Sequence, residues 1–331
     1  MTAWKTIGWG ALLSGVLAVL IVPLVVPVET SGTLTASEAA GPGATFVSLV
    51  DIDVHYEYEA YRGLAGDPPL MVLLHGFGAS TYSWNAVQGS LAAYGDVVSY
   101  DRPAFGFTQR PVAVEGESPY GVPAQLDLIR AISAEFAKPG QEVILVGHSA
   151  GGTLAAEFAL LFPGEVEALV LVAPAILSSG GGAGWLSFLT NIPQIDRIGP
   201  LLVGGIAESG NELLERSWHE GSALTPDIVS AYQQPLTVKG WERAFWEFST
   251  TPREFTITDN PEGLSLPTAI ITGDDDRVVA TEDSVALSKV VVGSTLAVIP
   301  QSGHLPHEET PDAFMESFSQ AWASFGFAFS P

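Results

Sequence analysis

Short runs of apolar residues alternate with stretches of helical spacing along most of the chain. From Thr45 onward most of these runs are nearly continuous in apolar residues, which is typical of strands buried on both faces of a sheet. The runs are FVSLVDIDVHYEYE, LMVLL, VVSYD, VILVG, ALVLVA, TAIIT and TLAVI, and the helical stretches between them include 122–136 and 152–162. This alternation predicts a doubly wound, mostly parallel α/β sheet.

About ninety residues of loop and helix patterns interrupt the alternation between ALVLVAPAI and TAIIT. Because a structureless loop of that length is implausible in a compact domain, we expect a mainly helical insertion. The predicted division is an N-terminal segment at 1–40, an α/β core formed by 41–176 and 267–331, and a helical insertion at 177–266.

The insertion has a recognisable helix start and many tryptophans. Thr225 followed by Pro226 has the pattern of an N-cap with proline in the first helical turn. We expect most of the insertion's tryptophans to form its own core and a few to line a pocket. These are Trp185, Trp218, Trp241 and Trp246.

The N-terminus carries 22 residues without a charge, from Ile7 to Val28. A helix of that length spans ~33 Å, about the hydrocarbon thickness of a bilayer. We therefore expect a retained transmembrane anchor, followed by a small-residue linker at 29–43. Small residues at 37–40 leave a cleaved secretory leader as the alternative. Lys5 precedes the run and the next basic residue is Arg62, so either reading places the rest of the chain outside the cytoplasm, membrane-anchored or secreted.

Composition excludes several classes of function. Thirteen Lys and Arg residues against 37 Asp and Glu give a formal net charge of −24, which repels phosphate backbones and disfavours a nucleic-acid partner. Cysteine is absent, so disulfides, zinc–thiolate sites and a cysteine nucleophile are excluded. A content of 47% hydrophobic and 15% charged residues is typical of a globular chain with an added apolar segment.

One serine lies where a predicted strand becomes a predicted helix, in VGHSAGG. Ser149 has the pattern of a helix N-cap, and it also has the pattern of a nucleophile in G-x-S-x-G, where Gly147 and Gly151 permit a tight turn. The motif alone leaves both interpretations open. A catalytic serine needs a base, a group that orients the base, and donors for an oxyanion, and these should follow other strands at the same edge of the sheet.

Three strand ends carry residues that could supply these groups. HGFG at 75–78 follows LMVLL and is either a simple turn or a loop that exposes a backbone N–H. GDDDR at 273–277 follows TAIIT, and its acids could be solvated turn residues, a cation site or the partner of a histidine. SGHLPHE at 302–308 follows TLAVI and places a histidine in a glycine-containing loop.

With this order of residues the chain resembles the α/β-hydrolase family over nearly all of its length from Thr45. The motifs that carry the resemblance are HGFGAS, DRPAFGFTQRP, GHSAGG, GDDDRVV and SGHLPHEETPDAF. The resemblance implies an α/β-hydrolase fold whose insertion is a cap over the site. It implies that Ser149 is the nucleophile, His304 the general base and acid, and Asp276 the orienting carboxylate, with Asp274 as second choice. The backbone N–H groups of Phe77 and Ala150 would form the oxyanion hole.

The resemblance implies a serine hydrolase for apolar, modest-sized carboxylic esters, with no cofactor or metal and a small-molecule ester as partner. Ser149 at the elbow disfavours the dehalogenase and epoxide-hydrolase branches, and HGFG disfavours esterases with an HGGG-type loop. The same triad would also serve lipases, C–C bond hydrolases, thioesterases and cofactor-free haloperoxidases. A membrane-anchored binding protein on a hydrolase fold is the non-enzymatic alternative, although no triad residue is missing.

Overall fold

The fold is built on one sheet of mostly parallel strands. The structure, a computed structural model, describes residues 20–25, 27–28, 31–63, 66–111, 118–178 and 192–326. Within these residues eight strands pair in the order β1-β2-β4-β3-β5-β6-β7-β8, with β1–β2 and β2–β4 antiparallel and the other pairs parallel. The strands are β1 (Thr45–Leu49), β2 (Ile52–Glu59), β3 (Leu70–Leu74), β4 (Asp96–Tyr100), β5 (Val143–His148), β6 (Ala168–Val172), β7 (Thr268–Gly273) and β8 (Thr295–Ile299). The predicted α/β-hydrolase sheet is confirmed.

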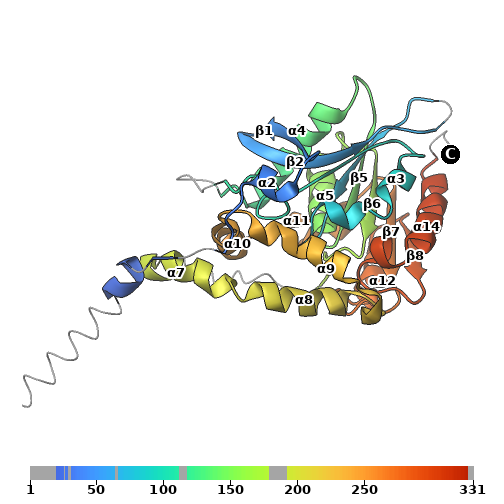
Figure 1. Cartoon of the computed structure of the whole chain (residues 1–331). Coiled ribbons are helices and arrows are strands. Elements are labelled where there is room, and N and C mark those ends of the chain that lie inside the picture. The colour runs from blue at the N-terminus through green and yellow to red at the C-terminus, as the bar shows by residue number, and fades with distance from the viewer. Residues whose placement is uncertain are drawn as a thin grey trace, which may run out of the picture.

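Helices cover both faces of this sheet because its strands are apolar on both faces (Figure 1). In β3, Leu70, Val72 and Leu74 pack into the core on one face, whereas Met71 and Leu73 pack into the core on the other. The first face is covered by α4 (Val122–Phe136), α5 (Ala150–Leu161) and α12 (Thr281–Val290), and the second by α3 (Gln88–Leu91) and α14 (Pro311–Ser324). The helix predicted at 122–136 coincides with α4, and α5 begins two residues before its predicted start.

The chain between β6 and β7 forms a helical cap. Its described helices are α7 (Pro193–Val203), α8 (Ile206–Ser217), η3 (Gly221–Ala223), α9 (Pro226–Gln233), η4 (Gln234–Thr237), α10 (Trp241–Thr250), α11 (Thr256–Asp259) and η5 (Pro261–Gly263). Figure 1 shows α7 to α10 lying together along one side of the molecule. The Thr225 side chain accepts a hydrogen bond from the N–H of Ile228 at 3.4 Å, as predicted for the N-cap of α9.

The predicted tryptophan core of the cap is present where the structure describes it. Trp241 and Trp246 are buried beside Phe105 and Phe248, and Trp218 is buried in a separate cluster, while Trp185 lies outside the described residues. From α11 onward the chain returns to the sheet, since Ile257 is completely buried in the core that contains α4 and α5.

The segment expected to be a linker is bound to the cap. The N–H groups of Thr33 and Leu34 donate to the carbonyl of Thr237 at 2.9 and 3.1 Å, and the N–H of Lys239 donates to that of Leu34 at 2.7 Å. The following residues form α2 (Ala36–Ala40), capped by a reciprocal Thr35–Glu38 pair. Residues 31–40 therefore lie as a strap across η4 and the start of α10. Besides these backbone bonds, Ser31 bonds to Glu242 and Trp241, and Gln234 donates to the carbonyl of Ala39. All of these partners are distant in the sequence, so the composition of the segment does not reveal the strap.

Most of the predicted membrane segment, Ile7–Val28, lies outside the described residues. Residues 20–25 are helical. Among the helices that can be described, none combines the length and the apolar character needed to cross a bilayer. The transmembrane anchor and its alternative, a cleaved leader, both stay predictions.

The register of the parallel strands brings five loops together at one edge of the sheet. Leu74 of β3 pairs with Gly147 of β5, and His148 pairs with Val172 of β6. Further along, Gly273 at the end of β7 pairs with Ile299 at the end of β8. The loops that follow these strands therefore start at the same level, as expected for the carboxyl edge of such a sheet.

Close packing at this edge predicts the effect of Gly151→Ala. A Cβ at Gly151 would lie 2.3 Å from the carbonyl oxygen of Leu74 and 2.5 Å from that of His75, so the backbone would have to shift. We expect the free energy of unfolding to fall by about 1–3 kcal/mol in urea titrations, as for other overpacked sites. Gly164→Ala is the matched control, because nothing lies within 4 Å of its added Cβ. Equal stability of the two variants would contradict the proposed packing.

Candidate active site

Ser149 connects β5 to α5 in a strained backbone conformation. Its φ and ψ are 52° and −119°, a region that non-glycine residues rarely adopt. The Ser149 hydroxyl makes no capping hydrogen bond to the first turn of α5, so the N-cap interpretation of this side chain is wrong. Backbone hydrogen bonds hold the turn, from the N–H of Ser149 to Val172 at 2.9 Å and from the N–H of Thr153 to Ser149 at 3.1 Å. The Ser149 hydroxyl is consequently not needed to hold this turn.

His304 and Asp276 form a buried pair in the loops after β8 and β7. Nδ1 of His304 lies 2.7 Å from Oδ2 of Asp276, and both residues are less than a tenth exposed. The other carboxylate oxygen accepts the N–H groups of Val278 and Val279 at 2.8 and 2.9 Å. An ionised carboxylate only accepts hydrogen bonds, so Nδ1 carries the ring proton and Nε2 is left as a proton acceptor.

The three consecutive acids after β7 have different partners. Asp276 pairs with His304, while Asp275 lies 2.8 Å from Nδ1 of His219 and also pairs with Arg277. Asp274, the second choice from the sequence, accepts the N–H of Ser302 at 3.3 Å. Among these carboxylates the structure thus brings the first choice to the histidine, and none of the three is free to form a cation site.

Ser149 and His304 line the same cavity, although no hydrogen bond joins the hydroxyl to the ring in this state. Bonds of this kind are often long in a free enzyme and shorten when substrate binds. The loop after β3 lies against the serine, since a Cβ at Gly76 would be 3.2 Å from Cβ of Ser149.

Two backbone donors near Ser149 are unoccupied. In the described part of the chain, neither the N–H of Phe77 nor that of Ala150 donates to a protein acceptor. Ala150 is also the first residue of α5, whose N-terminal partial charge favours an anion. The two predicted oxyanion donors are therefore available to a ligand.

Three further histidines around the site are buried and neutral. Burial lowers the pKa of His75 to about 3, with the nearby Arg102 charge as second cause, and burial likewise lowers the pKa of His307 to about 3. Burial also lowers the pKa of His148 well below its usual range, and its Nε2 donates to the carbonyl of His304 at 2.9 Å. Contacts to Arg102, Ser83 and His304 make these histidines part of the scaffold around the site.

The cap is hydrogen-bonded to the loop that carries His304. The N–H of His304 donates to the carbonyl of Ser217, the last residue of α8, at 2.7 Å. Next to it, Oε1 of Glu309 accepts the N–H of Glu220 at 3.0 Å and its Oε2 accepts that of Gly303 at 2.7 Å. The position of α8 and that of the His304 backbone are consequently coupled, a feature that sequence reasoning missed.

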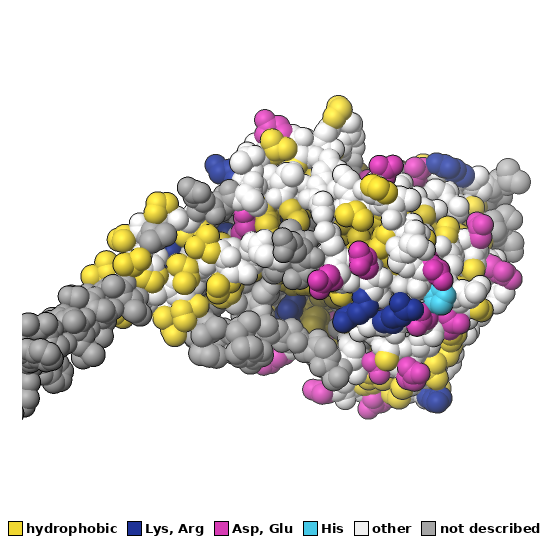
Figure 2. Space-filling view, turned by 60° about the horizontal axis from the view of Figure 1, so that its bottom comes forward, with side chains coloured by type: hydrophobic (Ala, Val, Ile, Leu, Met, Phe, Trp, Pro, Cys, Tyr) yellow, Lys and Arg dark blue, Asp and Glu magenta, His cyan; other side chains and the backbone are white. Residues whose placement is uncertain are grey.

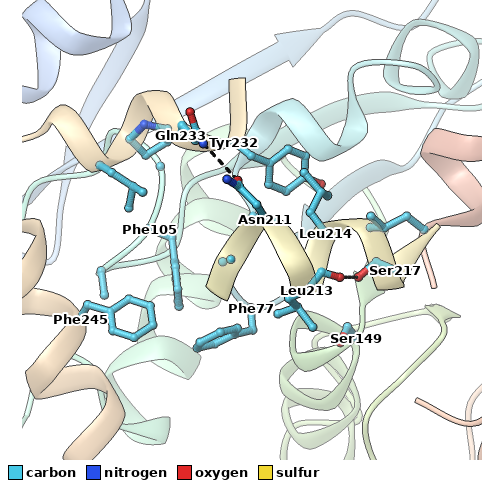
Figure 3. Close-up of a pocket in the computed structure, with 18 of the residues that line it drawn as sticks. Phe77, Phe105, Ser149, Asn211, Leu213, Leu214, Ser217, Tyr232, Gln233 and Phe245 are labelled. Carbon is cyan, nitrogen blue, oxygen red and sulfur yellow. Dashed lines mark hydrogen bonds between the residues drawn. The ribbon is translucent and has the colours of Figure 1, made fainter. Parts of the chain in front are cut away.

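A mainly apolar cavity of about 180 Å³ lies between the core and the cap. Figure 3 shows Leu213 and Leu214 extending into it from α8, opposite Phe77, Phe105 and Phe245. Its other lining residues include Ala79, Ala104, His148, Ser149, Asn211, Ser217, Tyr232, Gln233, Leu236, Trp241, Val278, His304 and Leu305. The amide of Gln233 donates to Asn211 at 3.1 Å, so these two polar groups satisfy each other.

A buried carboxylate, Glu308, connects the cap to the core beside this cavity. Oε1 of Glu308 accepts the hydroxyl of Tyr232 at 2.5 Å and that of Ser83 in η1 (Thr81–Trp84). Glu308 itself belongs to α13 (Pro306–Glu309). Burial raises its pKa to about 7, although the two hydroxyl donors act in the opposite direction.

Other pairs that the sequence did not reveal join distant segments. His55 of β2 lies 2.9 Å from Asp101, whose carboxylate also accepts the N–H groups of Thr81 and Phe107 at 2.6 Å each. Asp101 thus anchors the turn after β4, and nothing in the sequence pointed to His55 as its partner. The described residues contain no cluster of three or more side chains suited to hold a metal ion.

Comparison with known proteins agrees with this arrangement. A family profile described as the alpha/beta hydrolase family matches residues 71–317. The chain belongs to the α/β-hydrolase family. Among solved structures, this hydrolase fold is similar to an esterase from Thermogutta terrifontis, with a TM-score of 0.67 and 22% identity over 85% of this chain and 98% of the esterase.

Two curated relatives of this α/β hydrolase have different named activities. A 2-hydroxy-6-oxo-2,4-heptadienoate hydrolase of Pseudomonas putida is 27% identical over 72% of this chain and 83% of its own. The monoacylglycerol lipase ABHD6 of Mus musculus is 23% identical over 78% of this chain and 77% of its own. These relatives agree on the family of the chain but differ in substrate, so they do not decide which substrate this hydrolase takes.

The raised pKa of Glu308 predicts a pH-dependent stability difference. The pKa of Glu308 is about 7 in the folded protein and 4.5 in the unfolded chain. Its contribution to the free energy of unfolding is therefore complete below pH 4.5 and is lost as the pH rises through 7. Glu308→Gln keeps an acceptor for the two hydroxyls but does not titrate. Its unfolding free energy relative to the parent should rise by about 3 kcal/mol between pH 4.5 and 8, measured by urea unfolding.

Glu282→Gln is the control for the loss of one carboxylate, because Glu282 is exposed on α12. A constant difference between Glu308→Gln and the parent across this pH range would show that Glu308 is not buried as described.

Proposed function

We propose that this α/β hydrolase is a serine hydrolase that cleaves apolar, modest-sized carboxylic esters through an acyl-enzyme. The observation that carries the proposal is the pair His304–Asp276 at 2.7 Å in the cavity that also contains Ser149, whose hydroxyl makes no capping bond. The free N–H groups of Phe77 and Ala150 support it further, because acyl transfer needs donors for a developing oxyanion.

In the proposed mechanism Oγ of Ser149 attacks the ester carbonyl carbon while Nε2 of His304 accepts the hydroxyl proton. Asp276 holds the ring through Nδ1–H and stabilises the imidazolium, and the two backbone N–H groups bind the oxyanion. Collapse of the tetrahedral intermediate passes the proton from His304 to the departing alcohol and leaves an acyl–Ser149 ester. Water then attacks this ester with His304 again as base, which releases the carboxylic acid.

The cavity favours an apolar acyl ester over the carboxylate substrate named for the Pseudomonas putida relative. Arg110 is the single lysine or arginine among its described lining residues. The two Nη groups of its guanidinium donate to the carbonyls of Phe105, Gly106 and Thr108, and its buried Nε–H has no partner among the described residues. A substrate carboxylate would therefore find a single N–H on this cation, whereas an acyl chain would contact Leu213, Phe245 and their neighbours.

We further propose that the hydrolase is attached to a membrane with its catalytic domain outside the cytoplasm. This proposal rests on the charge-free run Ile7–Val28, on Lys5 before it, and on the absence of further basic residues until Arg62. Secretion after cleavage of the run is the alternative.

The proposed mechanism predicts the kinetics of two variants on p-nitrophenyl esters of increasing chain length. Ser149→Ala should lower kcat on the order of 10⁶-fold, and Asp276→Asn on the order of 10⁴-fold, because the asparagine favours the wrong tautomer of His304. Ser222→Ala, an exposed serine of the cap, is the control and should match the parent. Unchanged ester turnover by Ser149→Ala would refute the mechanism. Faster turnover of a 2-hydroxy-6-oxo-dienoate than of any ester would instead select the C–C hydrolase alternative.

A further inference from the structure

Exposed hydrophobic side chains concentrate on one part of the molecule, at α7 and residues 20–25. Of the sixteen exposed large hydrophobic side chains in the described part of the chain, eight belong to these two short segments. They are Leu20, Ile21, Val22, Leu24, Val25, Ile192, Leu201 and Leu202. Figure 2 shows hydrophobic side chains gathered at the end of the molecule where these segments lie.

Helix α7 buries one face against the cap and carries exposed apolar residues beside that face. On the inner face Gly199 lies so close to α10 that a Cβ would meet the Trp246 ring at 2.1 Å, and Val203 is buried among the aromatic residues of the cap. On the outer face Leu201 and Leu202 are 47% and 62% exposed. Exposed leucines next to a buried apolar face widen the apolar stripe of α7, which favours a second apolar environment besides the protein core.

Of the two charged residues of α7, Asp196 is directed toward the cap and Arg197 is exposed. Asp196 accepts the guanidinium of Arg243 at 3.1 Å and the indole N–H of Trp246 at 3.0 Å, so it is directed at α10. At the start of α7, the amide of Gln194 donates to the carbonyl of Leu20 at 3.2 Å. The two segments lie side by side in Figure 1, and hydrophobic side chains gather at this end of the molecule in Figure 2. The eight exposed residues named above are here called the α7 surface.

We propose that the α7 surface lies in the interfacial layer of a lipid bilayer, with α7 parallel to the membrane plane. Residues 20–25 of this surface belong to the 22-residue charge-free run Ile7–Val28, so the surface and the predicted membrane segment share residues and would meet the same bilayer. Amphipathic helices of this kind bury their apolar face ~5–10 Å into the boundary between headgroups and acyl chains. The net charge of −24 favours a zwitterionic over an anionic lipid surface.

This orientation brings the cap wall close to the lipid. Val203 of α7 packs in the same cluster as Phe105 and Phe245, which line the cavity of Ser149. Esters dissolved in the bilayer would therefore have a short path to the cavity. The path for bilayer esters rests on the proposed function, whereas the position of the α7 surface in the bilayer does not.

The absence of native cysteine allows a direct test in the full-length protein. Leu202→Cys, labelled with an environment-sensitive fluorophore, is reconstituted in phosphatidylcholine vesicles containing doxyl-labelled lipid. Its emission should shift to the blue and be quenched several-fold by the doxyl lipid. Val292→Cys is the matched control, since Val292 is 87% exposed outside the α7 surface, and its label should be quenched by aqueous iodide and not by lipid.

Two results would overturn the proposal. One is a label at position 202 that iodide quenches and doxyl lipid does not. The other is protection of the label from iodide that depends on protein concentration and persists in lipid-free detergent. That result would assign the α7 surface to contact with a second copy of the chain.

The double variant Leu201→Ser/Leu202→Ser separates this proposal from the proposed function. It should hydrolyse vesicle-borne esters several-fold more slowly than the parent and water-soluble p-nitrophenyl acetate at the parent rate. Equal losses on both substrates would contradict a bilayer-specific role. If the parent cleaves neither substrate while doxyl quenching at position 202 persists, the proposed function fails and the α7 surface stands.

Discussion

The close contact between the first turn of α5 and the end of β3 is the constraint on which the site depends. Gly151 lies directly above the carbonyls of Leu74 and His75, and Gly147 lies against Gly151 with no room for a Cβ. A helix that starts so close to the sheet leaves the connecting residue little conformational choice, and Ser149 takes a positive φ of 52°. The strained turn therefore fixes the Ser149 hydroxyl at the edge of the sheet, where the other loops begin.

The cap is attached to this edge through backbone as well as side-chain contacts. At one end, the carbonyl of Ser217 accepts the N–H of His304 itself. At the other, the strap pairs Leu34 with Val238, just before Trp241 in the cavity wall. A movement of α8 would consequently change the backbone position of His304 as well as the shape of the cavity. The position of the cap, the access to the cavity and the orientation of His304 therefore depend on one another.

The sequence predicted the elements whose signals are local. LMVLL and TLAVI coincide with β3 and β8 because continuous apolar runs identify strands buried on both faces. Ser149, Asp276 and His304 follow predicted strands, and parallel strands present their following loops at one edge, so the sequence marks these residues as candidates whose roles stay predictions. The choice among three adjacent acids came from the family resemblance, and the structure brings the same residue to the histidine.

Contacts between distant segments could not be predicted in this way. The strap of residues 31–40 has the composition of a linker, and its order comes from backbone and side-chain hydrogen bonds with residues about 200 positions away. Glu308 has no periodic or motif signal that would place it against Tyr232 of the cap. The lining of the cavity depends on how α8 and α10 pack, which hydrophobic periodicity does not specify.

The central claim is that Ser149 is the nucleophile of an α/β hydrolase. Its most direct test is mass spectrometry of the full-length protein after reaction with a fluorophosphonate, followed by peptide mapping. The account predicts a single adduct on the peptide that contains Ser149, and slower labelling of an Asp276→Asn variant because its histidine is no longer held in the required tautomer. No adduct, or an adduct on a different serine, would contradict the account.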